Sequence, residues 1–469
     1  MKILLVLMIL WGLTIEGNAQ PDSLWSVTYG AEDTLTDTWC SQVIETSDGC
    51  YVMAGYINRD AGEHWYSGNI VKVSDEGEIL WARELTDEIM FAPSAIIETN
   101  DSGFALAGRQ LSFGPSWIFK TNSEGETIWS LSLEADQALD IIQTRDGGYL
   151  VAGSENFSPN LIKTDEEGEI QWSQEYEIPA RPRSIVQNDQ GGFAIACSDG
   201  PNQSYVLFTD ENGDSTGLLT FPDIESFSIK SITLLPDEGY FISGRIYHEY
   251  SPYTLWALTI DFDGEIISSQ IFGPYQYQRY YYNTIIQTQD GGFVLGGDFR
   301  VEDRNFDFML LKTDENGDSL WSGSFGNDQN EYSKSLIQNR NGEYLLAGRS
   351  VNYEHLEPDA NFLLIKIGLD TLNTDYQESP ISRGFLLDHA YPNPFNSTVN
   401  IAFDLPRPKR IKMSIIDDLG RELVTIVDGY YQEGRHHTYW DAESVPAGMY
   451  IAKMQVDKQN VFRKLMLVK

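Results

Sequence analysis

The stretch Gln-Thr-Gln-Asp-Gly-Gly-Phe-Val-Leu-Gly-Gly at residues 287–297 decides the fold, because near copies of it recur along the chain. The other copies lie at residues 45–55, 98–108, 143–153, 187–197, 234–244 and 338–348. The residue that closes each copy stands 44 to 53 positions after the closing residue of the copy before it. This spacing is typical of the blades of a β-propeller, and seven copies predict seven blades.

A second motif completes each repeat and ends in Trp. It occurs at residues 71–81, 119–129, 162–172 and 311–321, with weaker copies around Gly213 and Gly264. In both motifs a turn containing Asp-Gly or Asn-Gly separates two short apolar runs, which is the signal of a β-hairpin. Two hairpins per repeat predict a four-stranded blade.

The first copy of the Trp motif is displaced. Residues 22–26 (Asp-Ser-Leu-Trp-Ser) match residues 318–322, yet they precede the first repeat, and the last repeat ends after residue 367 without a Trp strand. We therefore expect the strand around Trp25 to complete the seventh blade and leave no unpaired edge in the ring. The fold class is predicted as all-β, with a seven-bladed β-propeller that has a shared closing blade, followed by a small Ig-like β-sandwich.

The beginning of the chain is typical of a secretory signal. An apolar run at residues 3–13 is followed by small residues that end at Ala19, which predicts a signal peptide at 1–19 and a propeller at 20–370. No later segment is apolar for long enough to span a membrane. The three cysteines, Cys40, Cys50 and Cys197, are interpreted as packing residues.

Charge excludes two classes of partner. The net charge of -38 opposes binding to nucleic acid or to an anionic lipid surface. The excess acid is uneven, because residues 385–469 carry 11 Lys and Arg against 10 Asp and Glu, whereas the rest of the chain carries 21 against 60. This split predicts two independently folded parts.

The pattern of the repeats stops after Asp370. Residues 371–384 are interpreted as a linker, and residues 385–469 show alternating strands typical of a small antiparallel sandwich. This part contains Tyr-Pro-Asn-Pro-Phe-Asn at residues 391–396, Pro-Ala-Gly-Met-Tyr at 446–450 and a basic end at 464–469.

These motifs closely resemble, in the same order, the type A C-terminal sorting domain of the type IX secretion system of Bacteroidetes, which is similar to the Ig-like domain of flagellar hook-capping proteins. The resemblance implies that the secretion machinery is a partner and that the protein is secreted or displayed on the outer cell surface. The positions that carry the resemblance are Tyr391, Pro392, Asn393, Pro394, Phe395, Asn396, Gly420, Gly448, Tyr450, Lys464 and Lys469. The repeats look like the propeller cargoes attached to such domains, and that resemblance implies no activity.

Catalytic and metal-binding motifs are weak. The turns at 210–214 and 314–318 begin like calcium loops but lack the required order of ligands, so we interpret them as hairpin turns. Residues 74–81 resemble the Asp-box of sialidase propellers, but their Trp lies one position too far from the Gly, and Trp81 is interpreted as a packing residue. The six histidines show no metal-ligand spacing. We expect no cofactor and no metal, and the sequence leans against an enzyme without deciding the matter.

One region is rich in tyrosine. Eight of the 25 tyrosines fall between Tyr247 and Tyr282, in the loop of the fifth blade and in the connection to the sixth. Three arginines, Arg109, Arg245 and Arg349, directly follow the closing Gly of their repeats on the same face. An exposed strand end that balances acidic surface would also explain them. The predicted binding site consists of Tyr250, Tyr275, Tyr277 and Tyr280, with Arg245 at its edge.

The sequence thus favours a monomeric binding protein that recognises an extracellular glycan or protein. Two alternatives stay open. One is an extracellular polysaccharide hydrolase or lyase on a propeller scaffold, and the other is a structural component of the envelope. Convergent carboxylates on the loop face would favour the enzyme, whereas a tyrosine platform without an acid and a base would favour binding.

Overall fold

The computed structural model describes residues 23–467 with gaps. The larger gaps are 31–37, 59–65, 273–279, 301–305, 353–358 and 369–385, and the smaller ones are 87–88, 112–113, 201–202, 222–225, 236–237, 249–250, 316, 318, 327–328, 392–394, 406–407, 418–420, 433, 443–444, 447 and 457–458. The chain divides into two compact units, one of which contains strands β1 to β28 and the other β29 to β35. The described residues contain strands and turns but no helix.

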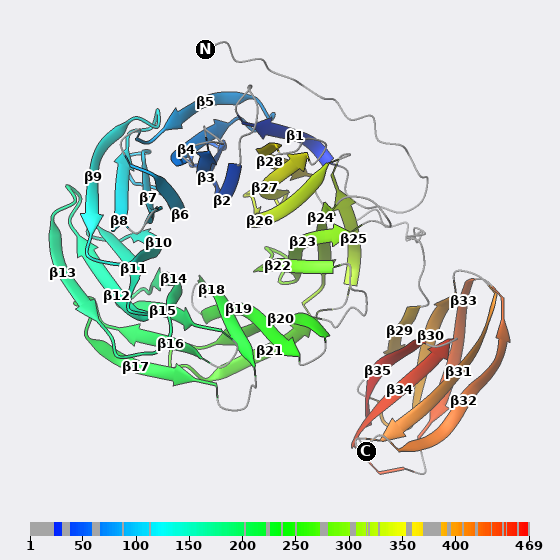
Figure 1. Cartoon of the computed structure of the whole chain (residues 1–469). Helices are drawn as coiled ribbons and strands as arrows, with labels where there is room; N and C mark the ends of the chain where they lie inside the picture. Colours follow the sequence, from blue (N-terminus) through cyan, green and yellow to red (C-terminus); the bar gives the residue numbers. More distant parts are fainter. Residues whose placement is uncertain are drawn as a thin grey trace. The chain divides into compact units, whose positions relative to one another are not determined.

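Seven four-stranded antiparallel sheets form the first unit and stand around a common centre as the blades of a propeller (Figure 1). In blades one to six the chain runs outward, so that the first strand is innermost and the fourth is outermost. Blade one contains β2 (Thr38–Glu45), β3 (Tyr51–Asn58), β4 (Tyr66–Val73) and β5 (Ile79–Glu84); blade two contains β6 (Phe91–Glu98), β7 (Phe104–Gln110), β8 (Ser116–Thr121) and β9 (Thr127–Leu133); blade three contains β10 (Gln137–Gln143), β11 (Tyr149–Glu155), β12 (Ser158–Thr164) and β13 (Ile170–Glu175).

The remaining four blades repeat this arrangement. Blade four contains β14 (Pro182–Gln187), β15 (Phe193–Ser198), β16 (Ser204–Thr209) and β17 (Ser215–Thr220); blade five contains β18 (Phe227–Leu235), β19 (Gly239–His248), β20 (Ser251–Ile260) and β21 (Ile266–Phe272); blade six contains β22 (Tyr280–Gln287), β23 (Phe293–Arg300), β24 (Phe306–Thr313) and β25 (Ser319–Phe325); blade seven contains β26 (Asn330–Gln338), β27 (Tyr344–Asn352), β28 (Asp359–Ile367) and β1 (Ser23–Tyr29). The predicted fold class is confirmed.

The N-terminal strand closes the ring. β1 pairs antiparallel with β28, with Trp25 opposite Lys366 and Tyr29 opposite Phe362. The outermost strand of blade seven therefore comes from the start of the chain, as the displaced Trp motif predicts, and it pairs the edge of β28 that the last repeat would otherwise leave open.

Tryptophans of the outer strands pack on the next blade. Gly77 adopts a φ of +87°, and a Cβ atom there would lie 2.7 Å from the Trp25 ring, so this turn requires glycine. Trp25 Nε1 also donates to the backbone oxygen of Asp75 at 2.8 Å. A Trp ring packs on a turn glycine of the next blade in the same way at Trp81 and Gly125, Trp129 and Gly168, and Trp172 and Gly213. Trp81 is therefore a packing residue, as predicted.

A buried lysine holds the aspartate of the first hairpin turn in four blades. Lys312 is fully buried, and its Nζ lies 2.9 Å from a carboxylate oxygen of Asp290 in the same blade. The equivalent pairs are Lys72 with Asp48, Lys120 with Asp101, and Lys163 with Asp146. These residues are the lysine of the second motif and the aspartate of the first, so the two motifs of a repeat depend on each other.

Side chains at the end of the innermost strands link successive blades. The backbone N–H of Ser47 donates to Glu98 at 2.6 Å, and that of Arg340 donates to Glu45 at 2.9 Å across the closure of the ring. The same bond joins Asn100 to Gln143, Arg145 to Gln187 and Gln289 to Gln338. The first residue of the repeat motif is therefore a contact between blades.

The second unit is a two-sheet sandwich. One sheet contains β29 (Leu386–Tyr391), β30 (Thr398–Leu405) and β33 (Gly434–Asp441); the other contains β32 (Glu422–Tyr431), β31 (Lys409–Asp417), β34 (Gly448–Val456) and β35 (Gln459–Leu467). Inward-facing residues of both sheets, such as Val399, Met413 and Met454, form one buried cluster.

In the first unit, residues 210–214 form a hairpin turn, as predicted, because the Asp210 carboxylate accepts the N–H groups of Asn212 and Asp214.

Candidate functional site

Each innermost strand is interrupted at the same place. The register of β18 against β19 shifts between Ile229 and Ser231, opposite the closing Gly244, so that one residue is extra. A bulge of this kind leaves its extra residue unpaired and changes the direction of the side chain. The equivalent extra residues are Ser41, Ser94, Leu139, Arg183, Lys230, Asn283 and Lys334.

Three of these extra residues are cations, and they act on one another. Burial and the positive charges of Arg245, Arg183 and Lys334 lower the pKa of Lys230 to about 8. Burial and Arg245 also lower the pKa of Lys334. Lys334 belongs to blade seven and Arg245 to blade five, with blade six between them. The extra residues occupy the same position of the innermost strands, which surround the centre of the ring (Figure 1), so the charges of blades five and seven act on each other there. We call Arg183, Lys230, Arg245 and Lys334 the axial cluster.

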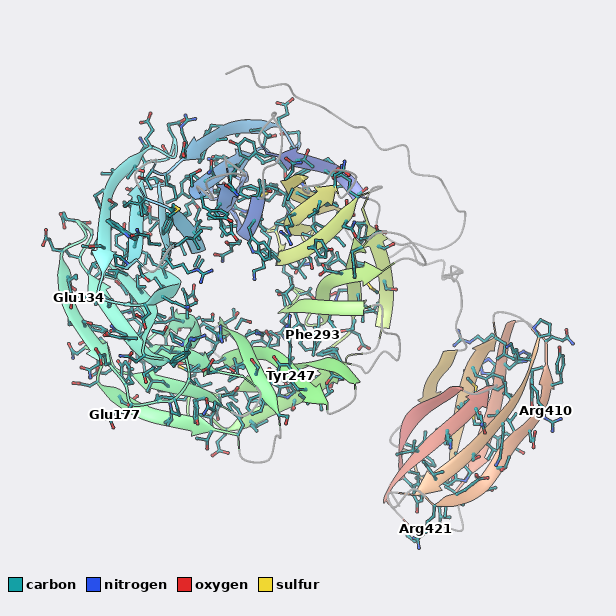
Figure 2. All side chains as sticks on the ribbon, in the orientation of Figure 1. Glu134, Glu177, Tyr247, Phe293, Arg410 and Arg421 are labelled. Carbon is teal, nitrogen blue, oxygen red and sulfur yellow. The ribbon has the colours of Figure 1, made fainter. Side chains whose placement is uncertain are left out.

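A tyrosine lies beside this cluster. Arg183 Nε donates to the backbone oxygen of Ser198 at 3.0 Å. Burial and Arg181 lower the pKa of Arg183, and Asp199 and Tyr247 are near enough to offset part of this shift. Tyr247 is half-buried, and its N–H donates to the backbone oxygen of Ser226 at 2.7 Å. Figure 2 shows Tyr247 on blade five, whereas Glu134 and Glu177 lie on the outer rim of the ring. The beginning of the tyrosine-rich region thus adjoins the axial cluster.

Two carboxylates lie at the seams between neighbouring blades, Asp140 on the innermost strand β10 and Asp298 on the second strand β23. Asp140 accepts the N–H groups of Ile185 and Ile141, both at 2.9 Å, and burial raises its pKa to about 6 despite these bonds. Asp298 Oδ1 accepts the N–H of Ser333 at 2.6 Å. Both carboxylates join one blade to the next. Among the described residues, no carboxylate is close enough to raise the pKa of Lys230 or Lys334.

The predicted binding residues divide into two groups. Tyr250, Tyr275 and Tyr277 lie outside the described residues. Arg245 is half-buried in β19 and belongs to the axial cluster. Tyr280 begins β22, where its backbone pairs with Phe299, and its side chain is not among those described.

One part of the prediction is wrong. The sequence predicts that Tyr280, Tyr281 and Tyr282 lie in the connection between blades, but they are the first three residues of the innermost strand β22. The high β propensity of tyrosine explains this result, because it extends the strand beyond the bulge at Asn283.

The three arginines that follow a closing Gly differ in their surroundings. Arg109 is exposed, whereas Arg349 stacks on aromatic rings between blades, with its guanidinium carbon 4.1 Å from the centre of the Trp39 ring and 5.3 Å from that of Tyr332. Only Arg245 is near the axial lysines among these three. Equivalent positions in a repeat therefore do not have equivalent roles.

In the second unit, two of the predicted sorting residues are structural. Phe395 is buried against Trp440, with ring centres 5.6 Å apart, and Tyr450 Oη donates to the backbone oxygen of Pro446 at 2.7 Å. Asn396 is exposed, Gly448 begins β34, Tyr391 ends β29, and the backbone of Lys464 pairs with Ile451 in β35. Pro392, Asn393, Pro394, Gly420 and Lys469 lie outside the described residues.

Sequence reasoning missed Arg183, Lys230 and Lys334. A usable signal was present, because the extra residue stands fourteen positions before the closing residue in all seven repeats. Aligning the repeats at that column would have shown three cations from different blades. The described residues contain no group of three or more His, Cys, Asp and Glu that could hold a metal ion. Among the described residues there is also no helix that is long and apolar enough to cross a membrane.

Comparison with known families identifies the second unit. Residues 389–469 match the family described as the secretion system C-terminal sorting domain. These residues form a type IX sorting domain. The chain is therefore addressed for export by the type IX system, to the cell surface or the medium, and the secretion machinery is its partner.

Comparison with solved structures finds similar chains at low identity. A protein of unknown function from Bacteroides caccae is 13% identical, over 62% of this chain and 94% of its own, with a TM-score of 0.40. The Pan2 WD40 domain of Neurospora crassa is 12% identical, over 76% and 99%, with a TM-score of 0.47. Puromycin hydrolase is 10% identical, over 80% and 59%, with a TM-score of 0.46. These likenesses are too distant to bear on function. No curated protein matches the sequence.

Proposed function

We propose that the propeller is an extracellular binding module that recognises a glycan or a protein once the sorting domain has taken it out of the cell. The observation that carries the proposal is the axial cluster with Tyr247 beside it. Guanidinium groups and tyrosines are the side chains most enriched at recognition surfaces, because they combine a large contact area with directed hydrogen bonds.

The surroundings of the cluster support binding over hydrolysis. A glycosidase needs one carboxyl group as an acid and a second as a nucleophile or a base, both directed at the substrate. The seam carboxylates Asp140 and Asp298 instead accept backbone N–H groups. Their hydrogen bonds give them a structural role between the blades.

A glycan and peptide array tests this function. The chain from Gln20 to Lys469 should retain members of one ligand class, and replacing Arg245, Tyr250, Tyr275, Tyr277 or Tyr280 by Ala should each reduce binding by about 1 to 2 kcal/mol. The control is Tyr439→Ala, because Tyr439 is 66% exposed in the sorting domain and should have no effect. An array with no retained ligand, or binding that the five variants leave unchanged, would contradict the proposal.

A further inference from the structure

We propose that the axis of the propeller binds an oxyanion, such as the carboxylate or sulfate of an acidic saccharide or a free inorganic anion, through Lys230, Lys334 and Arg183. This inference rests on the proposed function, because it names the chemistry of the ligand at the same site. The axial cluster gathers like charges from three blades in a protein whose net charge is -38.

The backbone holds these cations in place. Each stands at the bulge of an innermost strand, where the chain has one residue more than its partner. The seven bulge positions include three cations and no acid, although acids outnumber bases by 60 to 21 outside residues 385–469. From the composition of this part of the chain, acids would be expected at these positions more often than bases. The bulges show the reverse.

The cations are accessible as well as close together. Lys230 and Arg183 are half-buried, and Lys334 is exposed to solvent although the surrounding blades shield it enough to lower its pKa. Arg183, Lys230 and Lys334 stand at the same position of the innermost strands of blades four, five and seven, where these strands surround the centre of the ring (Figure 1). A ligand at the axis could therefore meet groups from three blades at once.

Electrostatics favours an anion at this place. Partly buried like charges repel, and an oxyanion between them would replace repulsion by charge-assisted hydrogen bonds. Acidic residues on the outer rim, such as Glu134 and Glu177, are exposed (Figure 2), and their fields are screened within about 8 Å at physiological salt. The overall negative charge would therefore slow the approach of an anion more than it would weaken the bound state.

The donors suit an oxyanion with several oxygens. The Nε atom of Arg183 donates to the backbone oxygen of Ser198, and no hydrogen bond among the described residues uses its two terminal nitrogens. A planar guanidinium prefers a carboxylate or a sulfate as its partner. Two ammonium groups add point charges that accept many directions of approach. A neutral sugar would bring no negative charge to Lys230 and Lys334, whose pKa values no described carboxylate raises.

Titration calorimetry at constant ionic strength tests the inference. The probes are inorganic phosphate, a galacturonic acid trisaccharide and the neutral galactose trisaccharide, each added to the chain from Gln20 to Lys469. We expect at least one of the two anions to bind and the neutral sugar not to bind. Binding of phosphate alone would indicate a free anion as the ligand, and preference for the acidic trisaccharide would indicate a saccharide. Each of Lys230→Gln and Lys334→Gln should weaken binding about tenfold.

Two controls make the result decisive. Arg109→Gln removes an exposed cation from the strand position equivalent to Arg245 and should leave binding unchanged. The double variant Lys230→Gln with Lys334→Gln should melt no lower than the parent without ligand, because it removes repulsion. Absence of binding by both anions, or undiminished binding by a folded double variant, would overturn the inference. In either case retention of a neutral ligand on the array would leave the proposed function standing.

Discussion

At the scale of single residues, the repeat motifs are explained by contacts between them. The sequence shows that Asp-Gly-Gly and an apolar-Lys unit recur, and hairpin chemistry predicts the turns. It does not show that the lysine of one hairpin lies buried under the aspartate of the other, as Lys312 and Asp290 do. That contact depends on the register of the second and third strands, which spacing alone does not fix.

The contact between Lys312 and Asp290 predicts how much the free energy of unfolding falls when the pair is broken. Asp290→Asn should destabilise the propeller by about 2 kcal/mol, because fully buried Lys312 would lose its negative partner and keep only neutral acceptors, such as the oxygens of Thr288 and Thr313. Urea unfolding measures the change. Asp189→Asn is the control, since Asp189 pairs with Arg145 on the exposed surface and should cost less than about 1 kcal/mol. Equal effects for the two variants would contradict a structural role for the buried lysines.

The same pairs predict how stability depends on acid. Partial burial alone would raise the pKa of Asp101, but hydrogen bonds from Lys120 and Thr99 outweigh it and hold the pKa at about 2. The unfolded carboxyl titrates near 3.8, so the contribution of the pair is complete above that pH and is lost as the pH falls toward 2. Melting curves should show a smaller drop between pH 4 and 2 in Asp101→Asn than in the parent. A drop of the same size in both proteins would contradict this assignment.

At the scale of elements, sequence patterns predict strands better than the bulges inside them. Period, turn residues and the displaced Trp25 are local signals, and the structure confirms the hairpins and the shared blade. A bulge changes the pairing by one residue, so Lys230 and Lys334 could not be placed on the axis from one repeat. The tyrosines at 280–282 were misplaced for the same reason, because the strand continues past its bulge.

Blade five shows where the repeats depart from their pattern. Gln287 is the first residue of the repeat motif in blade six. In five other blades, the side chain at this position accepts a backbone N–H group from the preceding blade. The Oε1 atom of Gln287 is buried without a hydrogen-bond partner among the described residues. The residue of blade five that aligns with the donors Ser47 and Arg145 is Pro236, and proline has no N–H to donate. The blade that supplies Arg245 and Tyr247 therefore lacks a link that most others have.

Closure of the ring predicts the effect of removing its N-terminal strand. Deleting residues 20–30 should lower the melting temperature and promote aggregation, because β28 would lose its partner and present an open edge. Calorimetry and size-exclusion chromatography measure the two effects. The matched control is Leu24→Ala, which trims a side chain that is 52% exposed in the same strand and should change neither. A deletion variant that melts with the parent and remains monomeric would disprove the shared blade.

At the scale of the whole molecule, the chain combines an address with a cargo. The uneven charge and the change of pattern after residue 370 predict two parts, and the structure contains two compact units. The sorting domain could be recognised from sequence because its motifs lie close together within 81 residues that match one family. The ligand of the propeller could not be recognised from sequence. The cations proposed to bind it come from separate blades, and only the closed ring brings them together.

The most direct test of this account is the location of the propeller in a host that carries a type IX system. Protease digestion of intact cells and assay of the medium should find the propeller of the full chain outside the outer membrane. The chain without residues 385–469 should accumulate in the periplasm as a folded, protease-resistant propeller. Recovery of the truncated protein from the medium or the cell surface at the yield of the full chain would contradict the account.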